Sequence, residues 1–273
     1  MDGQASFDAG QQHEVDGDLD AAVRDYVEAV RASPTQRRPY ELLLRIHLHR
    51  REIDAAWCAV SMIAAVGTLE GQEEELYEDY LPRRLPVLRR GLDAQEWQLL
   101  CAPCDGAISA VLAPKATQLA PRPTAIPALD PAVVEWAVAA FDIDAEAEAI
   151  APGTSLDEAA SLFTLRERRF AAGRQAARFR APHLVLAHAS PRALESVLAE
   201  ATIKGDVPAW QASLLATELR AGLLVCGEPR VARSMLLSER TPEEVLSDVA
   251  AFSVSPAHHR LRALLGLAVN MAE

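Results

Sequence analysis

The stretch Gly17-Asp-Leu-Asp-Ala-Ala22 recurs 34 residues later as Arg51-Glu-Ile-Asp-Ala-Ala56. Each copy places an aspartate before a pair of alanines, which the spacing predicts to be the first turn of a helix. Tyr26 falls on Val60 at the same offset. A small residue lets two helix backbones approach, and a larger residue one turn later fills the groove beside it. This period predicts two helical hairpins within residues 3–67.

These residues resemble the tetratricopeptide repeat (TPR), a 34-residue unit of two helices. Its pattern has small residues where the helices cross, a large residue between them and a terminating proline. In the first copy, five residues stand at the positions that this pattern expects: Gly10, Ala22, Tyr26, Ala29 and Pro34. The second copy keeps Tyr40, Leu43 and Ala56, but has Leu44 for a small residue and Thr68 for the proline. The resemblance implies a short helical solenoid that binds other proteins.

A proline-rich stretch follows the repeats. The 34-residue register is lost after Gly67, although residues 70–80 and 94–112 keep a helical spacing and are expected to complete and cap the stack. Prolines then recur without an apolar period, at Pro114, Pro121, Pro123, Pro127 and Pro131. Such a stretch is typical of a semi-rigid linker. We therefore predict a solenoid at 1–112, a linker at 113–131 and a second helical domain at 132–273.

Helix boundaries are marked clearly in the second half. Serine or threonine precedes proline at Ser190, Thr241 and Ser255, and a capping box spans Ser155 to Glu158. Glycines suited to a left-handed helix end occur at Gly205 and Gly227. These signals predict helices at about 132–149, 156–180, 191–204, 208–226, 229–239, 242–252 and 256–271.

Strand signals are scarce. The segment 183–188 alone has a strand-like composition, and it fits a buried loop or a helical turn equally well. The whole chain is therefore predicted to be all-α, a short TPR-like helical solenoid followed by a second helical domain.

Composition limits the class of protein. The chain has 273 residues, of which 39 are acidic and 27 basic, giving a formal net charge of −12. Such a charge disfavours binding to nucleic acid or to anionic lipid. No apolar stretch approaches the length of a membrane span, and the N-terminus has no leader pattern. With only four cysteines, a reduced, cytoplasmic protein without membrane insertion is expected.

A second resemblance rests on Phe170–Arg178 and Glu218–Gly222. These segments are similar to HtpX-like zinc metallopeptidases, which carry G-H-E-x-x-H on one helix and a third metal ligand on a later helix. The resemblance places Arg174 and Arg178 at the histidine positions, Gln175 at the glutamate and Leu215 at the third ligand. Arginine cannot coordinate zinc and glutamine cannot act as a base, so it implies an inactive relative. Alternatively, Gly173, Ala221 and Gly222 are ordinary small residues at a helix crossing.

Other chemical motifs are weak. Cys101-Ala-Pro-Cys104 has the spacing of a zinc or redox pair, but it stands alone and is interpreted as packing or surface thiols. Neither His47 with His49 nor His258 with His259 has the spacing of a ligand pair on a helix. No phosphate-binding loop or serine-hydrolase elbow occurs. The sequence thus predicts no catalytic residue, cofactor or metal.

Arginines cluster locally in this acidic chain. They lie between Arg31 and Arg51, and Arg37, Arg38 and Arg45 are the candidate partner-binding residues. A positive patch would attract an acidic peptide or a protein with an acidic segment. The alternative is a solvated face offset by neighbouring acids such as Glu41 and Glu52.

The sequence-based hypothesis is a non-catalytic interaction or scaffold protein that docks an acidic partner through its N-terminal region. The alternative is a pseudoenzyme whose inactive metallopeptidase-like domain binds peptides or regulates a peptidase. An enzyme whose chemistry the sequence does not reveal is a third possibility.

Overall fold

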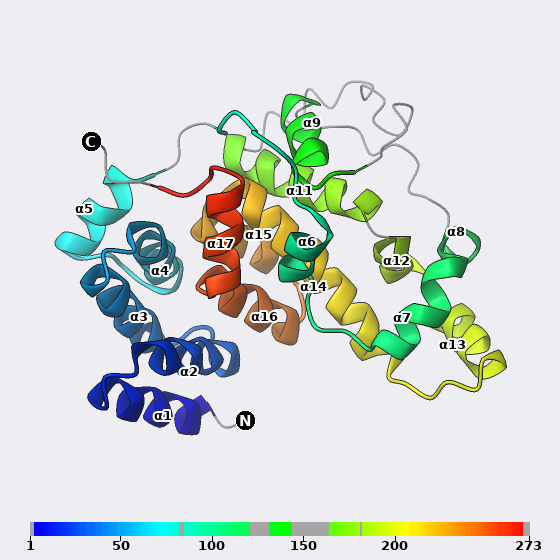
Figure 1. The fold of residues 1–273 in the computed structure, drawn as a ribbon, viewed down its shortest axis with the longest axis horizontal. Coiled ribbons are helices and arrows are strands. Elements are labelled where there is room, and N and C mark those ends of the chain that lie inside the picture. The colour runs from blue at the N-terminus through cyan, green and yellow to red at the C-terminus, as the bar shows by residue number, and fades with distance from the viewer. Residues whose placement is uncertain (1–2, 82–84, 121–130, 144–163, 181, 270–273) are drawn as a thin grey trace. The chain divides into compact units, whose positions relative to one another are not determined.

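The fold is built from helices. The computed structural model describes residues 3–81, 85–120, 131–143, 164–180 and 182–269, and these ranges contain helices and turns but no strand. The predicted all-α class is therefore confirmed. Figure 1 shows the chain as a series of short helices joined by turns.

The chain divides into two compact units, which we describe separately. The first unit contains residues 1–89 and 226–273, and the second contains residues 90–225. The helices of the first unit are α1 (Gly3–Val15), α2 (Leu19–Ala32), α3 (Arg37–His49), α4 (Ile53–Val66), α5 (Gln72–Asp79), α15 (Pro229–Ser238), α16 (Glu243–Ser253) and α17 (Pro256–Leu264).

The second unit contains the middle of the chain. Its helices are α6 (Ala94–Leu100), α7 (Gly106–Leu112), η1 (Ala113–Lys115), α8 (Ala116–Leu119), α9 (Pro131–Ala140), α11 (Leu165–Arg180), α12 (Pro182–Val185), η3 (Leu186–His188), α13 (Pro191–Glu200) and α14 (Val207–Cys226). The last of these helices leads back into the first unit.

This division differs from the boundary that the prolines suggested. Part of the predicted linker is helical in η1 and α8, while residues 121–130 lie outside the described residues. The C-terminal helices belong to the same unit as the repeats because α16 packs on α2 and α4, and α15 and α17 pack on α4. Contacts between segments far apart in sequence leave no local signal, so a proline count could not reveal them.

Many predicted helix ends agree with the structure, but α9 ends at Ala140 rather than at 149 and α17 ends at Leu264 rather than at 271. Ser190 and Ser255 cap α13 and α17, each followed by proline, and Gly227 has a φ of 72° directly after α14. The prediction for Gly205 is wrong, because the left-handed residue after α13 is Thr202, with a φ of 59°. Helix α16 begins after Pro242 rather than Thr241. The segment 183–188 is helical, in α12 and η3, and Ser155–Glu158 lies outside the described residues.

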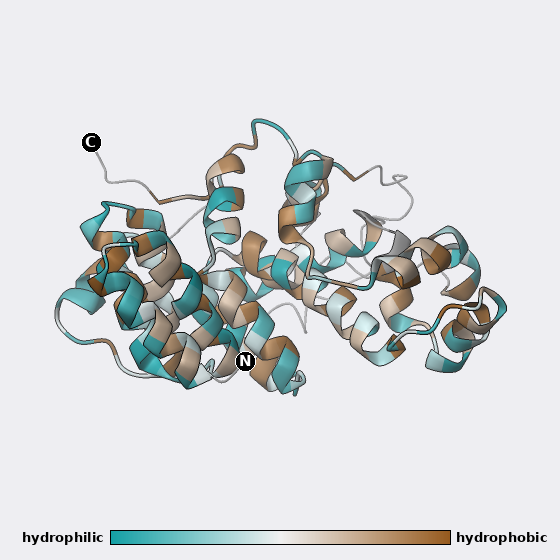
Figure 2. Ribbon diagram, turned by 60° about the horizontal axis from the view of Figure 1, so that its bottom comes forward, coloured by the Kyte–Doolittle hydropathy of each residue, from teal (hydrophilic) through white to brown (hydrophobic). Residues whose placement is uncertain are grey.

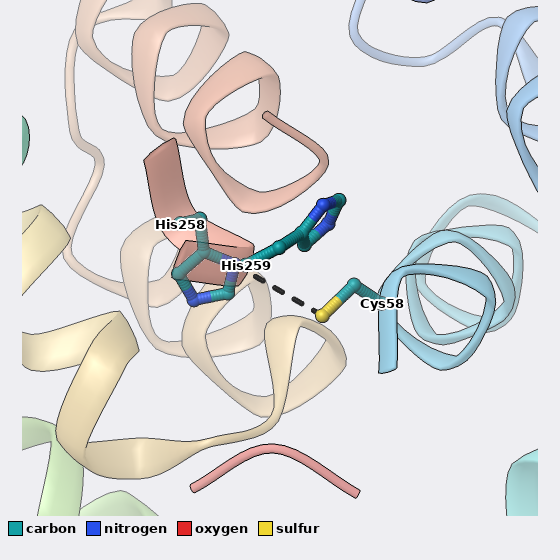
Figure 3. A group of neighbouring side chains, drawn as sticks. All are labelled: Cys58, His258 and His259. Atoms are coloured by element: carbon teal, nitrogen blue, oxygen red, sulfur yellow. Dashed lines mark hydrogen bonds between the residues drawn. The ribbon is translucent and has the colours of Figure 1, made fainter. Parts of the chain in front are cut away.

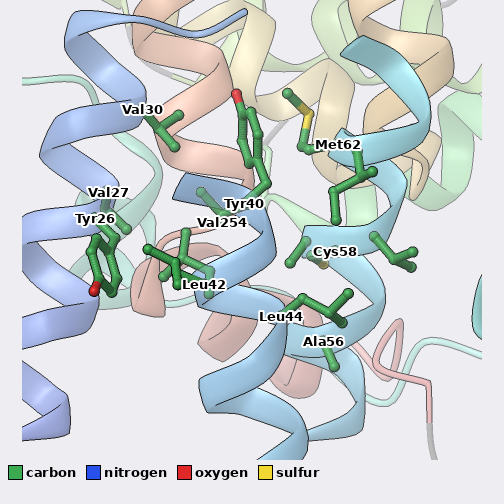
Figure 4. Packing of buried hydrophobic residues seen from close by; sticks show 14 of the residues in the cluster. Tyr26, Val27, Val30, Tyr40, Leu42, Leu44, Ala56, Cys58, Met62 and Val254 are labelled. Carbon is green, nitrogen blue, oxygen red and sulfur yellow. The ribbon is translucent and has the colours of Figure 1, made fainter. Parts of the chain in front are cut away.

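The first four helices form two hairpins with a shared core. Helix α1 packs on α2, α3 packs on α4, and α2 packs on α3 (Figure 1). Figure 4 shows side chains of α2, α3 and α4 gathered with Val254, which follows α16. Ala22, Tyr26 and Ala56 are fully buried. A Cβ on Gly10 would lie 2.7 Å from the Tyr26 ring. The packing of Tyr26 against α1 therefore requires a glycine at this position of the first copy.

The two hairpins repeat the same turn at the 34-residue offset. Gly17 and Arg51 both have a positive φ, of 81° and 59°. After Gly17, Asp18 N–H donates to His13 O at 2.9 Å, and after Arg51, Glu52 N–H donates to His47 O at 2.9 Å. This is the Schellman helix end, whose left-handed residue is usually glycine. The repeat therefore extends to backbone geometry, with arginine standing where the first copy has glycine.

Two glycines let helices α11 and α14 cross closely in the second unit. A Cβ on Gly173 would lie 2.6 Å from Ala221 O, and one on Gly222 would lie 2.9 Å from Phe170 O. Neither position accepts a side chain without moving a backbone. Residues that carried the metallopeptidase resemblance thus have a packing role, as the alternative interpretation predicted.

Hydrophilic and hydrophobic residues are interspersed along the helices (Figure 2). Within the described ranges, no helix combines the length and the hydrophobicity that crossing a membrane requires.

The left-handed turn gives a test of the repeat. Gly17→Ala should lower the free energy of unfolding by about 1 kcal/mol, because an L side chain is disfavoured at a φ of 81° while no atom lies within 4 Å of the added Cβ. Gly106→Ala is the matched control, since it also has open space but lies in the first turn of α7 at a negative φ. Urea unfolding measures both. Equal stability of the two variants would contradict the turn assignment.

Candidate functional site

The first unit contains a cavity of about 720 Å³. It lies between the start of α2, the turn from α3 to α4, the start of α17 and the segment after α17. Its lining residues are Asp20, Val23, Arg24, His47, Arg50, Arg51, Glu52, Ile53, Asp54, Ala55, Pro256, His259, Ala263, Ala268 and Val269. The cavity thus combines three arginines, three carboxylates and two imidazoles with an apolar surface.

A sulfur and several imidazoles meet beside this cavity. Cys58 of α4 and His258 of α17 are fully buried, and Cys58 Sγ lies 4.0 Å from His258 Nδ1. With His259 they form a group whose ligand atoms all lie within 4.8 Å of one another (Figure 3). The His47 ring of α3 packs edge-on against the His259 ring, with 5.4 Å between centroids. We refer to Cys58, His258, His259 and His47 as the histidine–cysteine cluster.

Two rings of the cluster have a fixed proton. His258 Nδ1 lies 2.8 Å from Ser253 O, and His47 Nδ1 lies 2.7 Å from Glu52 Oε2. Carbonyl and carboxylate oxygens only accept hydrogen bonds, so each Nδ1 is the donor. The Nε2 atoms of His47, His258 and His259 are buried without a hydrogen-bond partner among the described residues.

Burial sets the charge of the cluster. It lowers the pKa of His258 to about 3 and lowers the pKa values of His47 and His259, although the Glu52 carboxylate partly opposes the shift of His47. Burial also raises the pKa of the Cys58 thiol. At neutral pH the cluster therefore holds neutral imidazoles and a protonated thiol.

Arg262 lies beside the cluster and is fully buried. Its Nε and Nη2 donate to Asp54 at 2.8–3.1 Å, and its remaining bonds go to Gly227 O and Leu267 O. Its guanidinium carbon lies 5.3 Å from the centre of the Trp57 ring. This ion pair joins α17 to α4 across 208 positions of sequence.

In the second unit, two arginines of α11 meet a carboxylate of α14. Arg174 Nε donates to Glu218 Oε1 at 3.1 Å, and Arg178 donates to the same oxygen. His188 Nε2 lies 3.6 Å from Glu218 Oε2. Burial alone would raise the pKa of Glu218, but His188, Arg178 and Arg174 outweigh it and lower the pKa to about 2. Glu218 is thus ionised and is 1% exposed.

The structure brings together only part of the predicted degenerate metal site. Arg174 and Arg178 point to one group, but that group is Glu218 rather than Leu215. Leu215 is half-buried and lies three residues earlier on α14, while Gln175 is buried on α11. Sequence reasoning missed Glu218. A sequence signal for Glu218 existed, because a carboxylate in a helix with almost no other charged residue is expected to have a buried partner.

The candidate partner-binding arginines all have acidic neighbours. Arg37 donates to Glu41, to Glu73 and to Thr68 O. Arg38 pairs with Glu41, and Arg45 pairs with Glu14. The side chains of Arg38 and Arg45 remain 60% and 58% exposed, whereas that of Arg37 is 31% exposed.

Cys101 and Cys104 lie at the end of α6 and just after it. Cys101 is half-buried, Cys104 is exposed, and neither forms a disulfide. His49 is exposed at the end of α3, unlike the buried His47. The interpretation of these two cysteines as isolated thiols remains a prediction.

Comparison of the chain with protein-family models, with curated proteins and with solved structures found no match.

The histidine–cysteine cluster was missed because its members come from three helices. His258 and His259 are adjacent and therefore do not have the spacing of a ligand pair, and Cys58 lies 200 positions away from His258. A spacing rule on one helix cannot detect ligands that the tertiary fold brings together.

The acid stability of the protein should depend on Glu218. Because its pKa is about 2 in the folded protein and 4.5 ordinarily, the unfolded chain binds the proton first as the pH falls. The stabilisation is therefore complete above about pH 4.5 and is lost towards pH 2, with a size on the order of 3 kcal/mol.

Glu218→Gln should lower the free energy of unfolding at pH 7 by about 3 kcal/mol, since it leaves two arginines without their carboxylate. The loss should shrink as the pH approaches 2. Urea unfolding at pH 7, 4.5 and 3 tests this, with the exposed Glu195→Gln on α13 as the control. A loss that does not change with pH would contradict the ionised state of Glu218.

Proposed function

We propose that the protein is a non-catalytic interaction protein of the cytoplasm, which docks a partner through its TPR-like N-terminal hairpins. One observation carries the proposal. The two hairpins repeat at a 34-residue offset in three features: the small residues Ala22 and Ala56, the buried larger residues Tyr26 and Val60, and the left-handed turn at Gly17 and Arg51. Repeated helical hairpins are a common scaffold for binding peptides and proteins.

Helix α3 offers the surface for the partner. Arg38 and Arg45 are seven residues apart, so they lie on one side of the helix, and both guanidiniums are largely exposed. Their present partners, Glu41 and Glu14, form surface ion pairs, which typically contribute about 0–1 kcal/mol. An acidic segment can therefore replace these carboxylates at little cost.

Arg37 has a different role in this proposal. One of its three hydrogen bonds reaches Glu41 on α3 itself. The other two reach Thr68 O and Glu73, and these connect α3 to the residues that follow α4. We therefore assign Arg37 to holding the second hairpin against α5, and the partner-binding role to Arg38 and Arg45.

The pseudoenzyme alternative has one supporting observation. Arg174 and Arg178, at the positions that resemble metal ligands, share a single buried target on the neighbouring helix. That target is the protein's own Glu218, so both arginines already have a carboxylate partner within the fold. This arrangement favours a structural role for them over peptide binding.

The proposal is tested with the full chain and a fluorescent decapeptide of glutamate as the probe. Fluorescence anisotropy at 50 and 300 mM salt should give binding that weakens with salt. Arg38→Ala with Arg45→Ala should weaken binding at low salt at least fivefold and flatten the salt dependence, because both cationic contacts are lost.

The matched control removes two exposed cations of the second unit, Arg192→Ala with Lys204→Ala. It should bind the peptide as the unchanged protein does. An equal loss in both double variants, or no loss in the first, would contradict the proposed surface.

A further inference from the structure

The donor set of the histidine–cysteine cluster is characteristic of one class of ion. Thiolate sulfur and imidazole nitrogen are the ligands that Zn²⁺ and similar borderline ions prefer, in tetrahedral sites of four. Mg²⁺ and Ca²⁺ require oxygen ligands instead. Cys58, His258 and His259 provide three N and S ligands within 4.8 Å of one another, and His47 packs against His259.

The unpaired nitrogens point to a missing partner. A buried polar atom without a hydrogen bond costs about 1–3 kcal/mol, and such atoms are rare in folded proteins. Here the Nε2 atoms of three neighbouring histidines are all buried and unpaired within the described part of the chain. Water cannot replace the missing hydrogen bond in His47 or His258, because these residues are only 3% and 0% exposed. A bound cation would supply the missing partner of each nitrogen that binds it.

Neighbouring oxygens fix the tautomer of two of the rings. A histidine that binds a metal usually donates its other nitrogen to a carboxylate or a carbonyl, which fixes the lone pair on the ligating atom. His47 Nδ1 has such a partner in Glu52, and His258 Nδ1 has one in Ser253 O. In both rings the lone pair is therefore on Nε2, but His258 presents its Nδ1 edge to Cys58 and must turn to bind an ion shared with that sulfur.

We propose that Cys58, His258 and His259, with His47 as the fourth ligand, bind one divalent ion of the zinc class. The cavity supplies the route of entry, because His47 and His259 both line it. Binding removes the proton of the Cys58 thiol to solvent and forms the sulfur–metal bond, so affinity rises with pH. This site departs from the sequence-based expectation of no metal, and it is independent of the peptide surface on α3.

Binding must draw the ligands together. Bond lengths of about 2.0–2.3 Å place tetrahedral ligand atoms about 3.3–3.8 Å apart, closer than the present separations. Cys58 Sγ now faces His258 Nδ1 at 4.0 Å, so rotation of these side chains has to bring Sγ and Nε2 to the same ion. Both residues belong to one packed helix pair, α4 with α17.

The test uses the full chain without an affinity tag, stripped with a chelator and titrated with Co²⁺ as a spectroscopic probe. We expect one Co²⁺ per chain, with a thiolate-to-cobalt charge-transfer band and the intense visible bands of tetrahedral cobalt. Zn²⁺ should displace it. Absence of Co²⁺ binding, or octahedral cobalt without a thiolate band, would overturn the proposal.

Variants identify the ligands. Cys58→Ser should abolish the charge-transfer band, and Glu52→Gln, at a carboxylate that is 46% exposed, should weaken Co²⁺ binding about tenfold while the fold is retained by circular dichroism. The control is Cys101→Ser with Cys104→Ser, which removes the other cysteine pair and should leave the band unchanged. If the charge-transfer band survives in Cys58→Ser, or disappears in the control, the ion binds at another site and the proposal is wrong.

If Cys58→Ser does not fold, Glu52→Gln provides the test. An unaltered affinity of that variant for Co²⁺ would also show that the proposal is wrong.

Discussion

The ion pair between Arg262 and Asp54 is the contact on which the first unit depends. A guanidinium that is fully buried must have all its donors satisfied, and here Asp54, Gly227 O and Leu267 O accept them. Removing one member of a buried pair typically costs about 3–5 kcal/mol, because the other charge is left without a partner. The pair therefore fixes α17 on α4, and with it the segment after α17, whose Val269 N–H also donates to Asp54.

That constraint explains how so short a repeat region can be stable. Solenoid repeats bury their faces on neighbouring repeats, and about three are needed for a continuous core. The repeat region, α1 to α4, has two hairpins, and the apolar faces of α2 and α4 are covered instead by α15–α17. The cavity follows from the same arrangement, since the start of α17 closes the space beside the turn from α3 to α4.

The sequence predicted what depends on neighbouring residues and failed on what depends on distant ones. Serine before proline marked α13 and α17, and Gly227 marked the end of α14, because caps and left-handed turns act within a few residues. Thr202 took the role predicted for Gly205, since the backbone of a non-glycine residue can be held left-handed by a Schellman turn. The unit boundary and the histidine–cysteine cluster were invisible, because each joins residues of the N-terminal helices to residues beyond 225.

Charge balance connects the buried ion pair with the proposed metal site. Arg262 acts electrostatically on Cys58 and on both histidines of α17, so it opposes the arrival of a cation. The arginine and a divalent ion would bring three positive charges. Asp54, Glu52 and the Cys58 thiolate supply three negative charges, of which Asp54 bonds to the guanidinium and Glu52 holds a ligand ring. Buried charges are tolerated when they are paired, so loss of the thiol proton supplies one of the negative charges that a buried cation needs.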